Sequence, residues 1–194
     1  MTHSRLLAVL LTLCVLLTGC VPREKMSPTA IDITGLEYGK DFKLSDPGGK
    51  ERTLKEFRGK VVMVFFGFTQ CPDVCPTALY RAAEVKKKLG EEGSKFQTIF
   101  VTVDPERDTP TLLKDYTHAF DDSFLGLYTD LENTRKTADD FRIYYAKVST
   151  GSTYTMDHTA ISYLYDTKGN IRIGIKPNAS IDDVTQDVRF LLQN

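Results

Sequence analysis

A short stretch with two cysteines, Phe68-Thr-Gln-Cys-Pro-Asp-Val-Cys-Pro-Thr77, constrains this chain more than any other part of it. It follows an apolar run at 61–66 and precedes a helical pattern at 77–89, so a strand should lead in and a helix should lead out. Cys71 and Cys75 then lie where a strand ends and a helix begins, and the N–H groups and dipole of that helix favour the thiolate. The thiolate is the form that attacks a disulfide or binds a soft metal.

Three residues separate the two cysteines, whereas thioredoxin-type oxidoreductases have two between theirs. Positions four apart share a face at a helix start, so both sulfur atoms can point the same way. The pair could close a Cys71–Cys75 disulfide, or both thiolates could bind one ion. A purely structural disulfide is the third alternative, and it would be a weak one because so short a loop removes little chain entropy.

The first nineteen residues resemble a signal peptide rather than part of a fold. Arg5 gives a short positive region, and 6–17 is an apolar run too short to span a bilayer comfortably. The run closes on Leu17-Thr-Gly-Cys20, which resembles a bacterial lipobox, where the chain is cut before the cysteine and the thiol is acylated. The alternative is an ordinary signal peptide with a chance cysteine. We predict a lipoprotein signal peptide at 1–19.

The rest of the chain divides at residue 30. Residues 20–30 are predicted to be the lipidated cysteine and a tether, and 31–194 one domain, with the protein held on the extracytoplasmic (periplasmic or outer) side of the cell membrane. An exported location permits a disulfide. A composition of 41% hydrophobic residues supplies a sizeable core, and a formal net charge of −1 gives no reason to expect a nucleic-acid partner.

Strand and helix patterns alternate along the predicted domain. We expect strands at 61–66, 96–103, 126–129, 159–165 and 171–175, and helices at 77–89, 109–120, 131–141 and 181–192. The turn signal Asp46-Pro-Gly-Gly49 predicts an N-terminal β-hairpin on an edge of the main sheet. With a cysteine pair at the first strand–helix junction, this order favours an α/β, thioredoxin-like fold. We expect a mixed central sheet flanked by helices, with the hairpin as an N-terminal extension.

His158 is the third candidate for the site, directly before the strand expected at 159–165. In thioredoxin relatives the loop entering this strand carries a cis-proline that faces the cysteines, but here no proline occurs between Pro110 and Pro177. The histidine stands about where that proline would be. Two thiolates and one imidazole suit copper as Cu(I) or Cu(II), and Zn²⁺ would accept them with a water, so ligand type alone does not decide the metal.

Several other polar side chains are weaker candidates. Asp104 ends a predicted strand beside the cysteines and could support the ligands without binding the metal. Asp108, in the same stretch, is interpreted as part of a turn and helix cap, with Thr109 expected to cap the helix that follows. His118 is expected on a helix face, and Met156 is expected to pack in the core.

Three stretches resemble the signatures of the Sco/SenC family. They are Gly67-Phe-Thr-Gln-Cys-Pro-Asp-Val-Cys-Pro-Thr77, Val103-Asp-Pro-Glu-Arg-Asp-Thr-Pro110, and Asp157-His-Thr159 running on to Tyr163-Leu164. The resemblance implies a membrane-anchored copper protein of thioredoxin fold that is needed to assemble cytochrome c oxidase. It also implies that Cys71, Cys75 and His158 bind one copper ion per monomer. Many relatives carry a transmembrane helix where this chain has the lipobox.

The resemblance leaves two functions open. One is a metallochaperone, not an enzyme, that supplies copper to the binuclear copper centre of cytochrome c oxidase and requires His158. The other is a thiol–disulfide reductase that keeps the oxidase cysteines reduced, with Cys71 and Cys75 as its catalytic residues. The implied partners are the oxidase copper-centre subunit, an upstream copper donor and a thiol reductase. The missing cis-proline and the extra residue between the cysteines favour the metallochaperone. A third interpretation, a peroxidase-like lipoprotein, is disfavoured because no peroxidatic motif is visible.

Overall fold

The structure is a computed structural model that describes residues 24–194. The predicted signal peptide and Cys20 lie outside the described residues. Within 24–194, none of the helices combines the length and the apolar character needed to cross a membrane.

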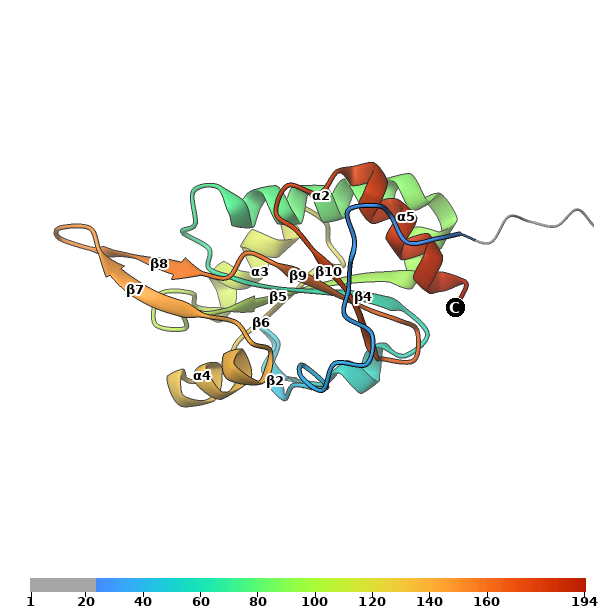
Figure 1. Cartoon of the computed structure of the whole chain (residues 1–194). Coiled ribbons are helices and arrows are strands. Elements are labelled where there is room, and N and C mark those ends of the chain that lie inside the picture. Colours follow the sequence, from blue (N-terminus) through green and yellow to red (C-terminus); the bar gives the residue numbers. More distant parts are fainter. Residues whose placement is uncertain (1–23) are drawn as a thin grey trace, which may run out of the picture.

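A six-stranded sheet forms the centre of the molecule (Figure 1). Its strands lie in the order β1-β10-β9-β4-β5-β6. Their bounds are β1 Ile31–Asp32, β4 Val61–Gly67, β5 Phe96–Thr102, β6 Leu125–Leu127, β9 Ser162–Tyr165 and β10 Ile171–Ile175. β4 pairs in parallel with β5 and antiparallel with β9, so the sheet is mixed, as predicted. Every residue of β4 and β5 is buried, which confirms that these apolar runs are covered on both faces.

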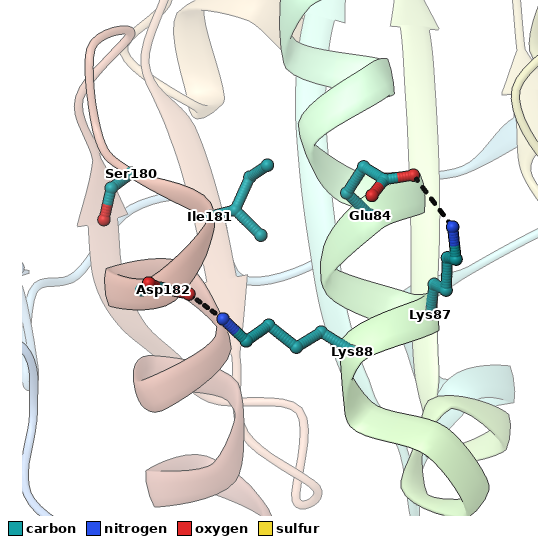
Figure 2. Close-up of a pocket in the computed structure, with 6 residues that line it drawn as sticks. All are labelled: Glu84, Lys87, Lys88, Ser180, Ile181 and Asp182. Atoms are coloured by element: carbon teal, nitrogen blue, oxygen red, sulfur yellow. Dashed lines mark hydrogen bonds and ion pairs between the residues drawn. The ribbon is translucent and has the colours of Figure 1, made fainter.

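Within residues 24–194, four α-helices and two 3-10 helices accompany the sheet. They are α2 Val74–Leu89, α3 Pro110–His118, α4 Leu131–Asp140, α5 Ile181–Leu192, η1 Leu54–Phe57 and η2 Gly90–Lys95. α2 and α5 lie side by side on the upper face of the sheet in Figure 1, and α4 lies on the lower face. An ion pair between Lys88 and Asp182 joins α2 to α5, as Figure 2 shows. The molecule therefore has the layered α/β architecture that the sequence predicts.

The helix after the cysteines begins earlier than expected, at Val74 rather than at residue 77. Pro76 does not prevent this, because the first N–H groups of a helix have no partner within the helix and a missing one costs nothing there. Cys75 therefore lies inside the first turn of α2, while Cys71 stays in the loop before it. At α3 the expected cap is present, since the Thr109 side chain accepts a hydrogen bond from Leu112 N.

The predicted N-terminal hairpin forms from β2 Leu44–Ser45 and β3 Glu51–Arg52. In its turn, Asp46 accepts hydrogen bonds from the N–H groups of Gly48 and Lys50, both at 3.0 Å. Ser45 and Tyr128 exchange backbone hydrogen bonds of 2.9 and 3.0 Å beside the edge strand β6. The hairpin therefore packs on an edge of the main sheet, as expected.

A second hairpin was not expected from the sequence. It consists of β7 Tyr145–Ser149 and β8 Tyr154–His158 and projects from the body of the molecule (Figure 1). Because of it, the sheet strand β9 begins at Ser162 rather than at residue 159. Met156 is the one buried residue of its two strands, and neither strand has the continuous apolar run that marks β4 and β5 in the sequence.

Residues 24–30, which the sequence assigns to the tether, lie along α5. Ser27 N and Ser27 Oγ donate to the Asp187 carboxylate at 2.6 and 3.0 Å, and Ser27 is buried. Thr29 Oγ1 donates to Asp183 at 2.9 Å. This part of the chain is therefore attached to the domain rather than extending from it.

Candidate metal centre

The two cysteines meet at the C-terminal edge of the sheet. β4 ends at Gly67, the loop that follows carries Cys71, and the first turn of α2 carries Cys75. Both are free thiols; Cys75 is fully buried and Cys71 is 9% exposed. A Cβ atom at Gly67 would lie 2.7 Å from Cys75 Sγ, so only glycine lets the backbone pass this close to the sulfur.

His158 completes the site from the end of β8. Its Nε2 atom lies 3.5 Å from Cys75 Sγ, and its Nδ1 atom lies 3.1 Å from Thr159 O. Because a carbonyl oxygen only accepts, we assign the proton to Nδ1, which leaves the Nε2 lone pair facing the sulfur. The rings of Phe65 and Phe68 pack edge-on against the imidazole, with centroids at 6.0 and 5.8 Å.

The three ligand atoms of Cys71, Cys75 and His158 all lie within 4.8 Å of one another. Two thiolates and one imidazole gathered this closely are a set of ligands that could hold one metal ion. The structure thus brings together the three residues that the sequence singles out, from two segments that lie 83 positions apart.

The two thiols differ in acidity. The pKa of Cys71 is lowered to about 4, chiefly because Cys75 hydrogen-bonds to its sulfur; burial opposes this, and the N–H of Asp73 adds to it. The same hydrogen bond, together with burial, raises the pKa of Cys75 above its ordinary value. The metal-free pair therefore holds one thiolate and one thiol, and a metal that binds both sulfurs must displace the proton of Cys75.

Arg107 joins the cysteine loop to the hairpin that carries the histidine. Its Nη1 atom donates to Gln70 Oε1 at 3.2 Å and to Tyr154 O at 2.7 Å. Its guanidinium carbon lies 3.7 Å from the centroid of the Tyr154 ring, a cation–π contact. The sequence prediction missed this residue, although a lone cation inside the acidic stretch 103–110 is a signal that could have drawn attention to it.

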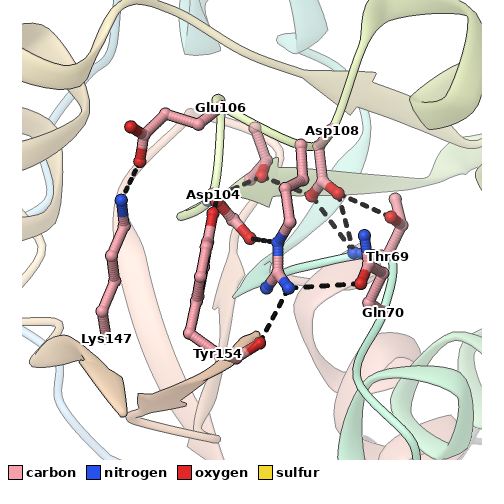
Figure 3. A network of polar contacts seen from close by, with 9 residues as sticks. Thr69, Gln70, Asp104, Glu106, Asp108, Lys147 and Tyr154 are labelled. Atoms are coloured by element: carbon pink, nitrogen blue, oxygen red, sulfur yellow. Dashed lines mark hydrogen bonds and ion pairs between the residues drawn. The ribbon is translucent and has the colours of Figure 1, made fainter. Parts of the chain in front are cut away.

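Asp104 belongs to the same network. It is buried, accepts from Arg107 Nε at 2.5 Å, and accepts from Tyr154 Oη at 2.9 Å (Figure 3). These contacts hold the start of β8, the strand that ends at His158. Asp104 therefore supports the site indirectly, by holding the hairpin strand that carries His158.

Asp108 lies in the turn before α3, as predicted, since its N–H donates to Asp104 O at 3.0 Å and Thr109 then caps the helix. It is buried and accepts from Thr69 N at 3.1 Å, Thr69 Oγ1 at 2.5 Å and Thr102 Oγ1 at 2.6 Å. Burial raises its pKa, and these hydrogen bonds oppose the rise. Asp108 therefore fixes the loop two residues before Cys71.

The remaining candidates lie where the sequence predicts. His118 is the last residue of α3, and Met156 is buried among core side chains.

Comparison with known proteins identifies the relatives of this arrangement. The family model described as SCO1/SenC matches residues 32–193. A SCO2-like protein from Rickettsia felis is 35% identical over 137 residues, which are 69% of this chain and 67% of that protein. The structure of Bradyrhizobium japonicum ScoI with copper bound is 39% identical, with a TM-score of 0.72, and the match covers 79% of this chain and 99% of that chain.

A SCO1/SenC family lipoprotein from Bacillus anthracis str. Ames is 27% identical, with a TM-score of 0.69, and the match covers 82% of this chain and 96% of that chain. The fold is therefore the thioredoxin-like fold of these proteins. Since the family model spans nearly all of the described residues, the chain belongs to the SCO1/SenC family.

Proposed function

We propose that this protein is a copper metallochaperone that binds one copper ion through Cys71, Cys75 and His158. The observation that carries the proposal is the convergence of their three ligand atoms within 4.8 Å. Soft thiolates with an imidazole are a donor set suited to copper, and the related ScoI of Bradyrhizobium japonicum has been solved with copper bound. The family resemblance extends the proposal to its target, the binuclear copper centre of cytochrome c oxidase.

Each of the three residues has a distinct part in binding. Cys71 supplies a thiolate that already exists in the metal-free protein, because its pKa is lowered to about 4. Cys75 releases its proton when the metal arrives. The hydrogen bond from Nδ1 to Thr159 O holds the His158 ring so that Nε2 is free to bind. Copper binding needs both thiols reduced, so an exported protein of this kind requires a thiol reductase as well as a copper donor.

The second candidate function is reduction of a disulfide in the oxidase copper site. The asymmetry of the pair favours it: Cys71 is the thiolate and is slightly exposed, whereas Cys75 is fully buried. Cys71 would attack the partner disulfide and release one partner thiolate. Cys75, losing its proton, would then attack Cys71 Sγ and release the second. The two electrons come from the pair, which ends as a disulfide.

Copper titration separates these functions. The reduced protein without its first twenty residues would be titrated anaerobically with Cu(I) against a competing chelator, as wild type, His158→Ala and the control His118→Ala. We expect one ion per chain and a loss of affinity above about a hundredfold in His158→Ala, because even residues behind a ligand typically contribute tenfold to hundredfold. The control should bind as wild type does. Weak binding, or binding indifferent to His158, would favour the reductase.

We also propose that Cys20 carries a lipid that holds the protein on the extracytoplasmic side of the cell membrane. The lipobox at 17–20 supports this proposal, and a Bacillus anthracis relative is described as a lipoprotein. Cys20→Ala should move the protein from the membrane fraction to the soluble fraction. Unchanged membrane association of that variant would refute the anchor.

A further inference from the structure

The N-terminal strap, residues 24–30, has hydrogen bonds at both of its ends that fix where it lies along α5. Thr29 bonds to Asp183 near the start of α5, and Glu24 N donates to Gln193 Oε1, at 3.2 Å, just beyond the end of α5. The strap therefore runs antiparallel to α5. Glu24, the first described residue, therefore lies at the C-terminal end of this helix.

The strap also shortens the free connection to the proposed lipid. Four residue steps separate Cys20 from Glu24. An extended chain covers at most about 3.6 Å per residue, so these steps reach roughly 14 Å. A free tether over residues 21–29 would have reached about 30 Å. The C-terminal end of α5 must therefore lie close to any membrane that holds the lipid.

The metal centre lies at the opposite end of the sheet. Val62, at the start of β4, pairs with Tyr165, at the end of β9, whereas the cysteine loop follows the other end of β4. β4 has seven residues, so its ends lie about 20 Å apart. The turn after β9 reaches the end of α5, because Lys168 Nζ donates to Asn194 O at 2.9 Å. The anchor end and the cysteine end therefore face opposite directions (Figure 1).

The anchor end carries a cationic hollow of about 550 Å³. The charged side chains that line it are four cations and two carboxylates, which gives the lining a formal charge of +2: Lys40, Arg58, Lys168 and Arg172 with Glu37 and Asp166. The carboxylates are paired within the hollow, Glu37 with Lys40 and Asp166 with Arg172. Guanidinium and ammonium groups at a membrane surface attract anionic phospholipid headgroups.

We propose that this hollow and the adjoining end of α5 form a surface that binds anionic phospholipid headgroups. The metal centre is then turned away from the bilayer, toward the aqueous side from which a protein partner approaches. This inference rests on the proposed lipid at Cys20. It adds the orientation of the domain and the chemistry of the lipid that it contacts.

The chain contains no tryptophan, so single tryptophans report position without interference. Leu36 lines the hollow and Val148 lies on the β7–β8 hairpin, and both are 45% exposed, which makes them a matched pair. The full lipidated protein would be reconstituted as Leu36→Trp or Val148→Trp in phosphatidylcholine vesicles, with or without phosphatidylglycerol. A nitroxide quencher would be attached to the lipid headgroups.

We expect strong loss of Leu36→Trp emission, stronger with phosphatidylglycerol, and little loss for Val148→Trp. Equal quenching of the two, or stronger quenching of Val148→Trp, would overturn the orientation while leaving the anchor intact. Failure of the lipidated protein to sediment with the vesicles would overturn the anchor and the orientation together.

Charge variants test the hollow itself. Replacing Arg58 and Lys168 by Gln should abolish the extra quenching caused by phosphatidylglycerol and leave Cu(I) affinity unchanged. The matched control replaces Lys87 and Lys136, two exposed lysines outside the hollow, and should keep the extra quenching. If inorganic phosphate alone shifts the Leu36→Trp emission and phosphatidylglycerol adds no quenching, the hollow is a site for a free anion and the proposal is wrong.

Discussion

Gly67 is a single residue on which the geometry of the metal centre depends. A Cβ atom there would lie 2.7 Å from Cys75 Sγ and 2.8 Å from a ring carbon of Phe100, and both neighbours are fully buried. Protein interiors are close-packed, so neither group has space into which it can move. The absence of a side chain at residue 67 is therefore a requirement of the site.

Gly67→Ala should displace the Cys75 sulfur and weaken Cu(I) binding by about tenfold to hundredfold, the range typical of residues that position ligands. The matched control is Gly48→Ala in the exposed β2–β3 turn, where the new Cβ meets only the Asp46 side chain, at 3.3 Å. Chelator competition measures the affinities, and circular dichroism confirms folding. A folded Gly67→Ala protein with wild-type affinity would contradict this account.

The cysteine pair makes stability depend on pH. The pKa of Cys71 is about 4 in the folded chain, and a thiol in an unfolded chain has a pKa of about 8.5. Between these values the unfolded chain binds one more proton than the folded chain. The free energy of unfolding therefore rises with pH in this range, and this stabilisation is lost as the pH falls toward 4. Above about 8.5 the sign reverses, because the raised pKa of Cys75 keeps its proton on the folded chain.

Thermal unfolding of the reduced, metal-free protein across this range measures the effect. Cys71→Ser should lose the rise below pH 8.5, because serine does not ionise there, while the carboxylates that titrate near pH 4 to 5 affect both proteins alike. Parallel profiles of Tm against pH for the two proteins would show that Cys71 does not carry the lowered pKa.

At the scale of secondary structure, the β7–β8 hairpin is the element that decides where the histidine lies. Its strands pair with each other rather than with the main sheet, so its orientation depends on side-chain contacts with the body. Arg107 makes several of these contacts, to Tyr154 on the hairpin and to Gln70 on the cysteine loop. It is therefore a positioning residue for His158.

Arg107→Ala should weaken Cu(I) binding by about tenfold to hundredfold. In a His158→Ala background the same change should add little, because the residue acts through the histidine. Lys147→Ala is the control: its ammonium also lies over the Tyr154 ring, at 4.8 Å, but its ion pair with Glu106 is at the surface and contributes little. Losses of affinity that simply add in the double variant would contradict the positioning role.

At the largest scale, the strap joins the first described residues of the chain to its last helix, α5. Ser27 and Asp187 are 160 positions apart, and Asp187 is buried, so its carboxylate relies on the strap for hydrogen bonds. The strap therefore contributes to the stability of the domain as well as setting where the chain leaves it.

Ser27→Ala should lower the free energy of unfolding by about 1–3 kcal/mol, the cost of leaving a buried polar group without one of its partners. Thr29→Ala, which removes an exposed hydrogen bond to Asp183, should cost less. Urea denaturation of both variants measures the difference. Equal losses of unfolding free energy in the two variants would show that the burial of Asp187 does not make its hydrogen bond with Ser27 more stabilising than the exposed one.

Features that depend on residues close together in the chain could be predicted from the amino-acid pattern. The apolar runs of β4 and β5, the cysteine spacing, the Thr109 cap and the Asp46 turn all depend on side chains a few positions apart, so a local pattern is enough to predict them. The order of these elements, with a cysteine pair at the first strand–helix junction, was enough to predict the thioredoxin-like fold.

Other features could not be predicted, because they depend on contacts between residues that are far apart in the chain. The sequence predicts Asp108 only as part of a turn and helix cap, and its additional hydrogen bonds to Thr69, 39 positions away, are seen only in the structure. The hairpin was missed because it has almost no buried face, and Arg107 was missed because its partners come from two other segments. The strap packs on a helix from the far end of the chain, and no local pattern can encode such a contact.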